Sequence, residues 1–93
     1  MRKTFGRFEL VEVPVVNLNG TSRQALIEGV LDCDLAIVNA MQVLRQNSPH
    51  GRDYPSLGSI ERALADHRSR LDRLEAIQKE FQAIGDHLCE VIP

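Results

Sequence analysis

The sequence predicts an all-α fold, an antiparallel two-helix hairpin that follows an extended N-terminal arm. Apolar residues recur at steps of three and four in two long stretches, and a proline-bounded segment separates these stretches. The core has to be aliphatic, because the 93 residues include no Trp, one Tyr and three Phe. We therefore expect an arm at residues 1–18 and a single helical-hairpin domain at residues 19–93.

Length and charge exclude several functional classes. A chain of 93 residues makes one small domain and leaves no room for a large enzyme core. The 11 basic and 13 acidic residues give a net charge of −2, which lacks the positive field that duplex binding needs, so we do not expect a nucleic-acid partner. No apolar run approaches a membrane span or a signal sequence, so we expect a cytoplasmic protein without a membrane partner.

The arm has β-branched, partly alternating apolar residues, which favour extended structure. Pro14 restricts this segment to an edge strand or an extended arm, since proline has no amide hydrogen to donate. The apolar residues concerned are Phe8, Leu10, Val13, Val15 and Val16.

A first helix is expected from Thr21 to just before Pro49. Thr21 and Gln24 have the spacing of a capping box, and Pro49 disfavours helical geometry at Ser48. The predicted core stripe is Leu26, Val30, Cys33, Ile37, Ala40 and Leu44, with Ile27, Leu31, Val38 and Met41 on a neighbouring stripe.

A second, longer helix is expected to start near Ser56 or Ser59. Its heptad core positions are Leu57, Ile60, Leu64, His67, Leu71, Leu74, Gln78, Phe81, Gly85, Leu88 and Ile92. His67 is a polar residue on this core stripe, where a hydrogen-bonded place within a helix interface is the simplest interpretation and a role in setting register is the alternative.

Two helices cover only part of such broad apolar faces, so the sequence also predicts a homo-oligomer that closes into a helical bundle. The residues expected at the interface between copies are Val30, Ile37, Leu44, Leu64, His67, Leu71, Leu74 and Phe81.

Catalytic and metal-binding patterns are not found in the sequence. His50, His67 and His87 are well separated and have no zinc-ligand spacing, and Cys33 and Cys89 fall in apolar periodic stretches where a buried thiol is expected. No nucleophile, metalloprotease or phosphate-loop motif is present. We therefore expect no enzyme, no metal and no cofactor.

The segment between the helices is the candidate binding site. His50, Arg52, Asp53 and Tyr54 bring an imidazole, a guanidinium, a carboxylate and the only Tyr together around Gly51. Arginine can clamp a phosphate and tyrosine can stack on a purine base. The alternative is structural: Arg52 and Asp53 would fasten the loop while Tyr54 packs over the helix ends.

Asn19, Gly20 and Thr21 form the other candidate. They are an ordinary helix cap, or a weak anion site at a helix N-terminus. In one hairpin this cap and the loop should lie at opposite ends. An antiparallel pairing of two hairpins would bring them together and make a shared anion pocket.

The sequence resembles a family of short, mostly uncharacterised proteins of bacteriophages and other bacterial mobile elements. The resemblance rests on Leu-Asn-Gly-Thr-Ser at residues 18–22, Pro-His-Gly-Arg-Asp-Tyr-Pro at 49–55 and Asp-His-Arg at 66–68, and it covers residues 18–84. The family has two tyrosines before the second proline where this chain has only Tyr54. The resemblance implies no activity.

A looser resemblance, in architecture only, is to phage helical-hairpin sponge proteins that oligomerise and sequester cyclic-nucleotide signals. We therefore expect a non-enzymatic homo-oligomer that binds a small phosphate-containing, nucleotide-like ligand between subunits. The alternative is a structural or protein-interaction module that binds a host or phage protein through its helical faces.

Overall fold

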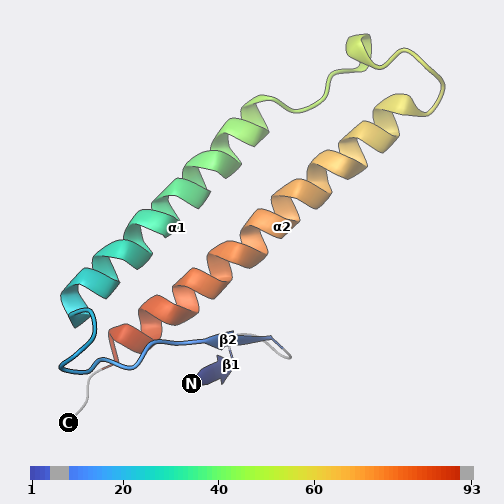
Figure 1. Cartoon of the computed structure of the whole chain (residues 1–93). Helices are drawn as coiled ribbons and strands as arrows, with labels where there is room; N and C mark the ends of the chain where they lie inside the picture. The colour runs from blue at the N-terminus through green and yellow to red at the C-terminus, as the bar shows by residue number, and fades with distance from the viewer. Residues whose placement is uncertain (5–8, 91–93) are drawn as a thin grey trace.

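The structure, a computed structural model, describes residues 1–4 and 9–90. It confirms the two predicted helices, α1 (Arg23–Gln46) and α2 (Ser59–Leu88), which run antiparallel and form a hairpin (Figure 1). The molecule is long and thin, with extents of 60 × 25 × 20 Å.

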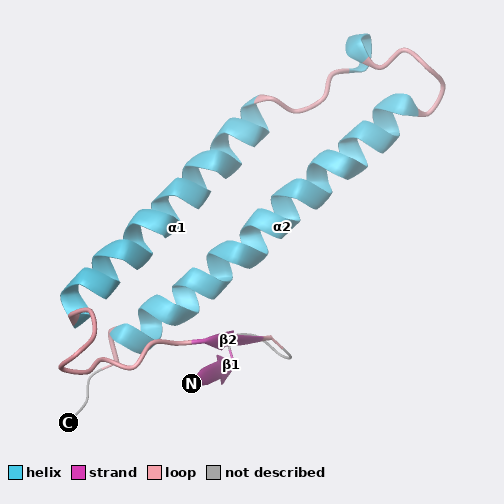
Figure 2. Ribbon diagram, in the orientation of Figure 1, coloured by secondary structure: helices cyan, strands magenta, loops and turns pink. Residues whose placement is uncertain are grey.

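The N-terminal arm adds a small sheet to the expected all-α fold. Strands β1 (Arg2–Thr4) and β2 (Leu10–Glu12) pair antiparallel, with Lys3 opposite Val11 (Figure 2). The Val13 amide extends the ladder by donating to the Met1 carbonyl at 2.6 Å. Pro14 follows at the end of this pairing, where its missing amide hydrogen costs no ladder bond. The predicted apolar position Phe8 lies outside the described residues.

The cap of α1 lies one residue later than the predicted capping box. Ser22 has an extended backbone and its hydroxyl accepts a hydrogen bond from the Ala25 amide at 3.2 Å. The capping box from Thr21 to Gln24 is therefore wrong, and the Gln24 amide nitrogen donates instead to Glu28 Oε1 at 3.1 Å. At the other end, the Asn47 side chain donates to the Val43 carbonyl at 2.8 Å and closes the helix.

Four of the six predicted core positions on α1, Leu26, Val30, Ile37 and Leu44, are partly shielded as expected, but the shielded stripe is centred slightly to one side of the predicted one. Asp34 and Met41 take the places expected for Cys33 and Ala40, and both of the latter are exposed. Met41 is only 6% exposed. Burying its long side chain removes more apolar area from water than burying Ala40 would, which favours this rotation even though it carries Asp34 toward the seam.

The predicted buried thiols are wrong in this hairpin. Cys33 and Cys89 are both free and exposed. Cys33 lies beside the shielded stripe, and Cys89 follows the last residue of α2 as its C-cap.

Helix α2 begins at Ser59, behind Gly58, which has a positive φ of 75°. Leu57 is therefore outside the helix and fully exposed, so the predicted core stripe begins at Ile60 instead. His67 is buried, as expected for a residue on this stripe, but the hydrogen bond predicted for it is not found within the described residues. The last predicted stripe position, Ile92, lies outside the described residues.

The best-buried part of the core lies where the arm crosses α2. Val11, Val13 and Leu88 are nearly inaccessible there, and Figure 1 shows β2 running across the end of α2. Along the rest of the hairpin, Met41 and His67 are the buried residues in the described part of the chain, and the other facing side chains are only partly shielded because just two layers are present. Large apolar side chains that stay exposed on the two helices are Leu31, Leu35, Val43, Leu64 and Ile77.

Candidate functional site

The loop between the helices contains one short 3-10 turn, η1 (Gly51–Asp53). His50 caps it: the His50 Nδ1 accepts a hydrogen bond from the Arg52 amide at 3.2 Å, and the His50 carbonyl accepts one from the Asp53 amide at 3.0 Å. The imidazole therefore has a local structural role. Gly51 has no positive φ, so the turn does not depend on the conformational freedom of glycine there.

Arg52, Asp53 and Tyr54 lie exposed on this turn. Within the part of the chain that the structure describes, no hydrogen bond or ion pair engages the Arg52 guanidinium, the Asp53 carboxylate or the Tyr54 hydroxyl. The expectation that Arg52 and Asp53 fasten the loop thus finds no contact in this hairpin. These three side chains remain available to a ligand or to another chain.

The Asn19, Gly20 and Thr21 cap is organised by a residue before it, Asn17. The Asn17 Oδ1 accepts from the Asn19 amide at 3.0 Å, and its carbonyl accepts from the Gly20 amide at 3.2 Å. Two of the amides expected to be free for an anion are therefore already used. What this segment offers outward is its exposed side chains, the Asn19 amide group and the Thr21 hydroxyl.

The two predicted groups are not brought together in one chain. In Figure 1 the segment before α1 lies at the end of the hairpin that holds both termini, and the loop with η1 lies at the opposite end. With a long dimension of 60 Å, no small ligand can touch both groups within one hairpin.

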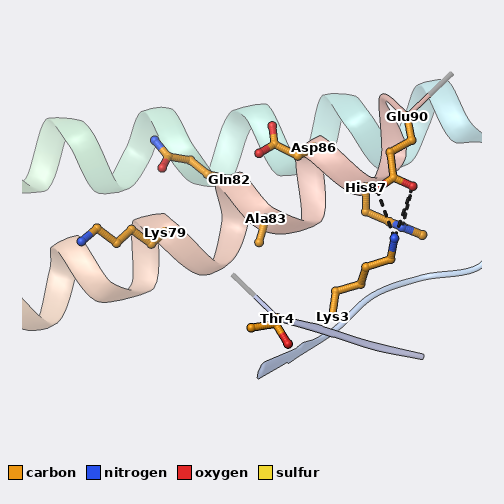
Figure 3. Close-up of a pocket in the computed structure, with 8 residues that line it drawn as sticks. All are labelled: Lys3, Thr4, Lys79, Gln82, Ala83, Asp86, His87 and Glu90. Atoms are coloured by element: carbon orange, nitrogen blue, oxygen red, sulfur yellow. Dashed lines mark hydrogen bonds and ion pairs between the residues drawn. The ribbon is translucent and has the colours of Figure 1, made fainter. Parts of the chain in front are cut away.

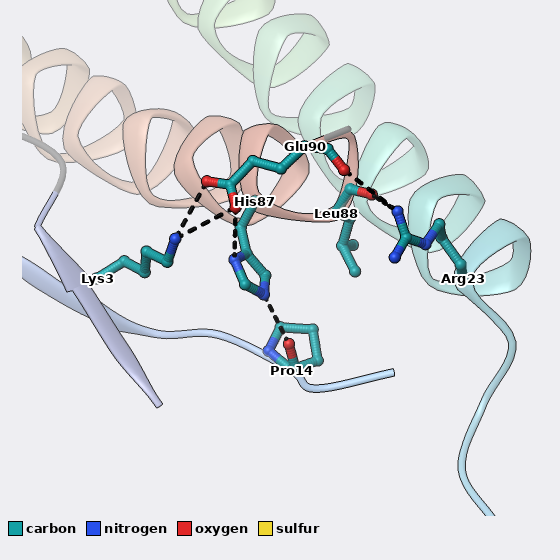
Figure 4. A network of polar contacts seen from close by, with 6 residues as sticks. All are labelled: Lys3, Pro14, Arg23, His87, Leu88 and Glu90. Carbon is teal, nitrogen blue, oxygen red and sulfur yellow. Dashed lines mark hydrogen bonds and ion pairs between the residues drawn. The ribbon is translucent and has the colours of Figure 1, made fainter. Parts of the chain in front are cut away.

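Sequence reasoning missed a polar clasp that fastens the arm to the end of α2 (Figure 4). Lys3 Nζ donates to both carboxylate oxygens of Glu90, at 3.1 and 3.3 Å. His87 Nε2 donates to the Pro14 carbonyl at 3.0 Å, and Arg23 donates to the Leu88 carbonyl at 3.1 Å. These partners are separated by more than 60 positions in the chain, so no local pattern could have found them.

A pocket of about 350 Å³ opens between β1 and the last turns of α2 (Figure 3). Its two lysines are both paired: Lys3 with Glu90, and Lys79 with Glu75 at 4.0 Å. Each lysine of the pocket thus has an acidic neighbour, and three of the polar residues in its lining, Lys3, His87 and Glu90, belong to the clasp.

Two further grooves lie between α1 and α2. The groove nearer the loop has a volume of about 430 Å³ and is lined by Met41, Arg45, Leu64, His67, Arg68, Leu71, Asp72 and Glu75. The groove nearer the termini has a volume of about 210 Å³ and is lined by Ile27, Val30, Leu31, Asp34, Phe81, Gln82, Gly85, Asp86 and Cys89. We call them the loop-side groove and the terminal-side groove.

Charge is distributed unevenly along the hairpin. The helical halves near the loop carry a net +2, from Arg45, Arg62, Arg68, Arg70 and Arg73 against Glu61, Asp66 and Asp72. The halves near the termini carry a net −4, from Arg23 and Lys79 against Glu28, Asp32, Asp34, Glu75, Glu80 and Asp86. The overall charge of −2 hides this division, which sequence inspection could have found once the helix pairing was assumed.

Within the described residues, no group of three or more His, Cys, Asp or Glu side chains is placed to hold a metal ion. Neither α1 nor α2 combines the length and hydrophobicity that crossing a membrane requires. No protein-family model, curated protein or solved structure matches the chain.

Proposed function

We propose that this protein is the non-enzymatic subunit of a homo-oligomer in which hairpins pack through their helical faces. The observation that carries this proposal is the apolar surface left on the two helices, where Leu31, Leu35 and Leu64 are 54%, 64% and 43% exposed. Exposed apolar surface of this extent on a thin two-layer hairpin is typical of a partner interface. Of the residues predicted for that interface, Leu64 is exposed and remains available to a partner. The other seven are partly or fully shielded within the hairpin itself, namely Val30, Ile37, Leu44, His67, Leu71, Leu74 and Phe81.

The charge division supports an antiparallel arrangement of the copies. When two hairpins pack head to tail, the +2 half of one faces the −4 half of the other. A head-to-head arrangement would place like charges together. Complementary charge contributes more to orientation and specificity than to affinity, so it selects the arrangement rather than driving association.

In this arrangement the loop of one copy approaches the cap of its partner, and we propose a small phosphate-containing ligand for the pocket between them. The unengaged Arg52 guanidinium would clamp the phosphate, and Tyr54 would stack on a base. The partner's Asn19 and Thr21 side chains would add polar contacts. Sequestration of a nucleotide-like signal in the cytoplasm, the role of the phage sponge proteins that the chain resembles in architecture, is the function this pocket would serve.

The competing proposal is a protein-interaction module. The exposed pair Leu31 and Leu35 on α1 supports it, because a leucine stripe beside acidic Glu28 and Asp32 also suits a helical segment of a different protein.

Measuring the mass in solution tests the shared part of these proposals. Light scattering after size-exclusion chromatography should give at least twice the 10.4 kDa chain mass at micromolar concentration. A monodisperse 10.4 kDa species would contradict self-association. An oligomer that no nucleotide stabilises against heat, but that retains a protein from the host, would favour the interaction module.

A further inference from the structure

Both interhelical grooves open on one face of the hairpin. On α1 all of their lining residues except Val30 form a single stripe at alternating steps of four and three, namely Ile27, Leu31, Asp34, Met41 and Arg45, with Val38 completing it. On α2 the same spacing joins Leu64, Arg68, Leu71, Glu75, Gln82 and Gly85, and it continues to the C-cap Cys89. Residues at such steps lie above one another on a helix, so the two grooves share a face.

The loop-side groove contains cationic groups without partners. Arg45 and Arg68 make no ion pair or side-chain hydrogen bond within the described residues. His67, only 7% exposed, makes no hydrogen bond within the described residues, but neither of its ring nitrogens is fully buried. Its imidazole edge therefore still faces the groove, where a partner could contact it.

The terminal-side groove contains the complementary acids. Asp34 is half-buried on the seam, and its Oδ1 is fully buried without a hydrogen-bond partner. Leaving one carboxylate oxygen buried without a donor is costly, and a cation beside the other oxygen, which is not buried, would offset part of that cost. Asp86 lines the same groove and makes no ion pair within the described residues.

We infer that two copies pack antiparallel on this face about a twofold axis, with Arg45 paired to the partner's Asp34 and Arg68 paired to the partner's Asp86. A twofold axis in the interface stacks α1 on α1 and α2 on α2, which is the geometry these pairs require. This inference rests on the proposed self-association and names its contacts.

The Arg45–Asp34 pair on α1 and the Arg68–Asp86 pair on α2 each fix where the twofold axis crosses the hairpin, and the two positions agree. The midpoint of Asp34 and Arg45 falls between Asn39 and Ala40, and the midpoint of Arg68 and Asp86 is Ile77. The contact between Val30 and Gly85 sets the register of the hairpin and puts Val38 level with Ile77. The two midpoints therefore differ by 1.5 residues, about 2 Å along a helix, which is well within the reach of an arginine side chain.

Glu75 and Lys79 give a third sign of the same axis. They stand two residues on either side of Ile77, so each would face its opposite charge on the partner's α2. Within one chain their charged atoms are 4.0 Å apart and both side chains are more than half exposed, so this pair is weak and each side chain could turn to the partner.

The test mixes two variants that cannot pair with themselves. Arg45→Glu places two acids opposite each other in its own homodimer, and Asp34→Lys places two cations opposite each other. In a mixed dimer both contacts are again between opposite charges. Native mass spectrometry of an equimolar mixture should therefore show heterodimers associating at least about tenfold more tightly than either homodimer.

Substituting the partly buried Asp34 could disturb the packing of α1 against α2, so a second pair of variants uses exposed positions only. Arg68→Glu and Asp86→Lys alter exposed side chains of α2, and their mixture should show the same preference for heterodimers. Arg70→Glu is the matched control, since Arg70 is on α2 but lines neither groove; mixed with Asp86→Lys it should show no preference. Circular dichroism verifies the helical content of each variant.

The outcomes separate the two proposals. An oligomeric wild type with statistical mixing in both variant pairs would overturn these contacts while leaving self-association intact. A monomeric wild type would overturn both. Preferential heterodimers in at least one pair, weakened by high salt, would establish the antiparallel face.

Discussion

Val30 and Gly85 meet across the hairpin, where a methyl group on Gly85 would lie 3.4 Å from Val30 Cγ1. This distance lies at the short end of ordinary van der Waals contact, so one methyl group fits beside Val30 with no room to spare on that side. The close approach of the two helices therefore depends on a small residue at position 85.

We expect Gly85→Ala to stabilise the protein by about 1 kcal/mol, because alanine has the higher helix propensity. The melting temperature should rise by roughly 4–8 °C for that gain. Gly29→Ala is the control: nothing lies within 4 Å of its added methyl group, so its change in stability reports helix propensity without a new contact. Gly85→Leu should instead cost about 1–3 kcal/mol through overpacking. A stabilising leucine would mean that the helices do not approach closely here.

Val30→Asp and Leu74→Asp should each disrupt folding or assembly. Both positions are partly shielded on the facing helices, and an unpaired carboxylate there costs on the order of 3 kcal/mol. Urea unfolding followed by circular dichroism measures the loss. Asn39→Asp, at an exposed position of α1, is the matched control and should leave the transition almost unchanged.

Arg52→Ala should abolish most ligand-induced stabilisation and leave the hairpin folded, because the exposed guanidinium makes no contact within the described residues. For the wild type, a bound nucleotide at 100 times its dissociation constant adds about 2.7 kcal/mol, which thermal-shift measurements across a nucleotide panel would detect. Arg70→Ala serves as the charge-matched control. The binding proposal would be contradicted if Arg52→Ala unfolded the protein and no nucleotide raised the melting temperature of the wild type. The loop would then have a structural role only.

Tyr54→Ala should weaken purine-nucleotide binding by roughly 1–3 kcal/mol, the scale of lost base stacking. Binding of inorganic phosphate should change far less, because phosphate has no aromatic face. Isothermal titration of both ligands distinguishes these effects, and Tyr54→Phe should retain the stacking. Equal losses for nucleotide and phosphate would contradict a stacking role.

The pKa of Glu12 lies below its ordinary value of 4.5, chiefly because the Met1 ammonium donates a hydrogen bond to it, with help from the charge of Arg2. Since the folded-state pKa is lowered, the pair stabilises the arm above the unfolded-state pKa. This contribution is lost as the pH falls through the folded-state pKa. NMR titration of Glu12, with exchange of the Val13 amide, should show this loosening; Glu12→Gln should remove the pH response.

The two helices and their limits could largely be predicted from the sequence, because they depend on local chemistry. The apolar spacing, Pro49 and the cap residues near Ser22 act within a few positions of where they lie. Errors of one residue, such as Thr21 for Ser22, arose because both hydroxyls are competent caps. The start of α2 at Ser59 is one of the two predicted positions, but the N-cap role of Gly58 was missed, since a positive φ leaves no mark on the sequence beyond the glycine itself.

The sequence alone determined that His67 falls on a helical core stripe and that the loop and the cap lie at opposite ends of one hairpin. Tertiary structure decided the rest. The rotation of α1 that buries Met41, exposes Cys33 and draws Asp34 to the seam depends on which face α2 covers. The clasp of Lys3 and Glu90 joins residues 87 positions apart. Local periodicity shows that a helix has an apolar stripe. Which of two neighbouring stripes is buried depends on how the helix packs against a second element.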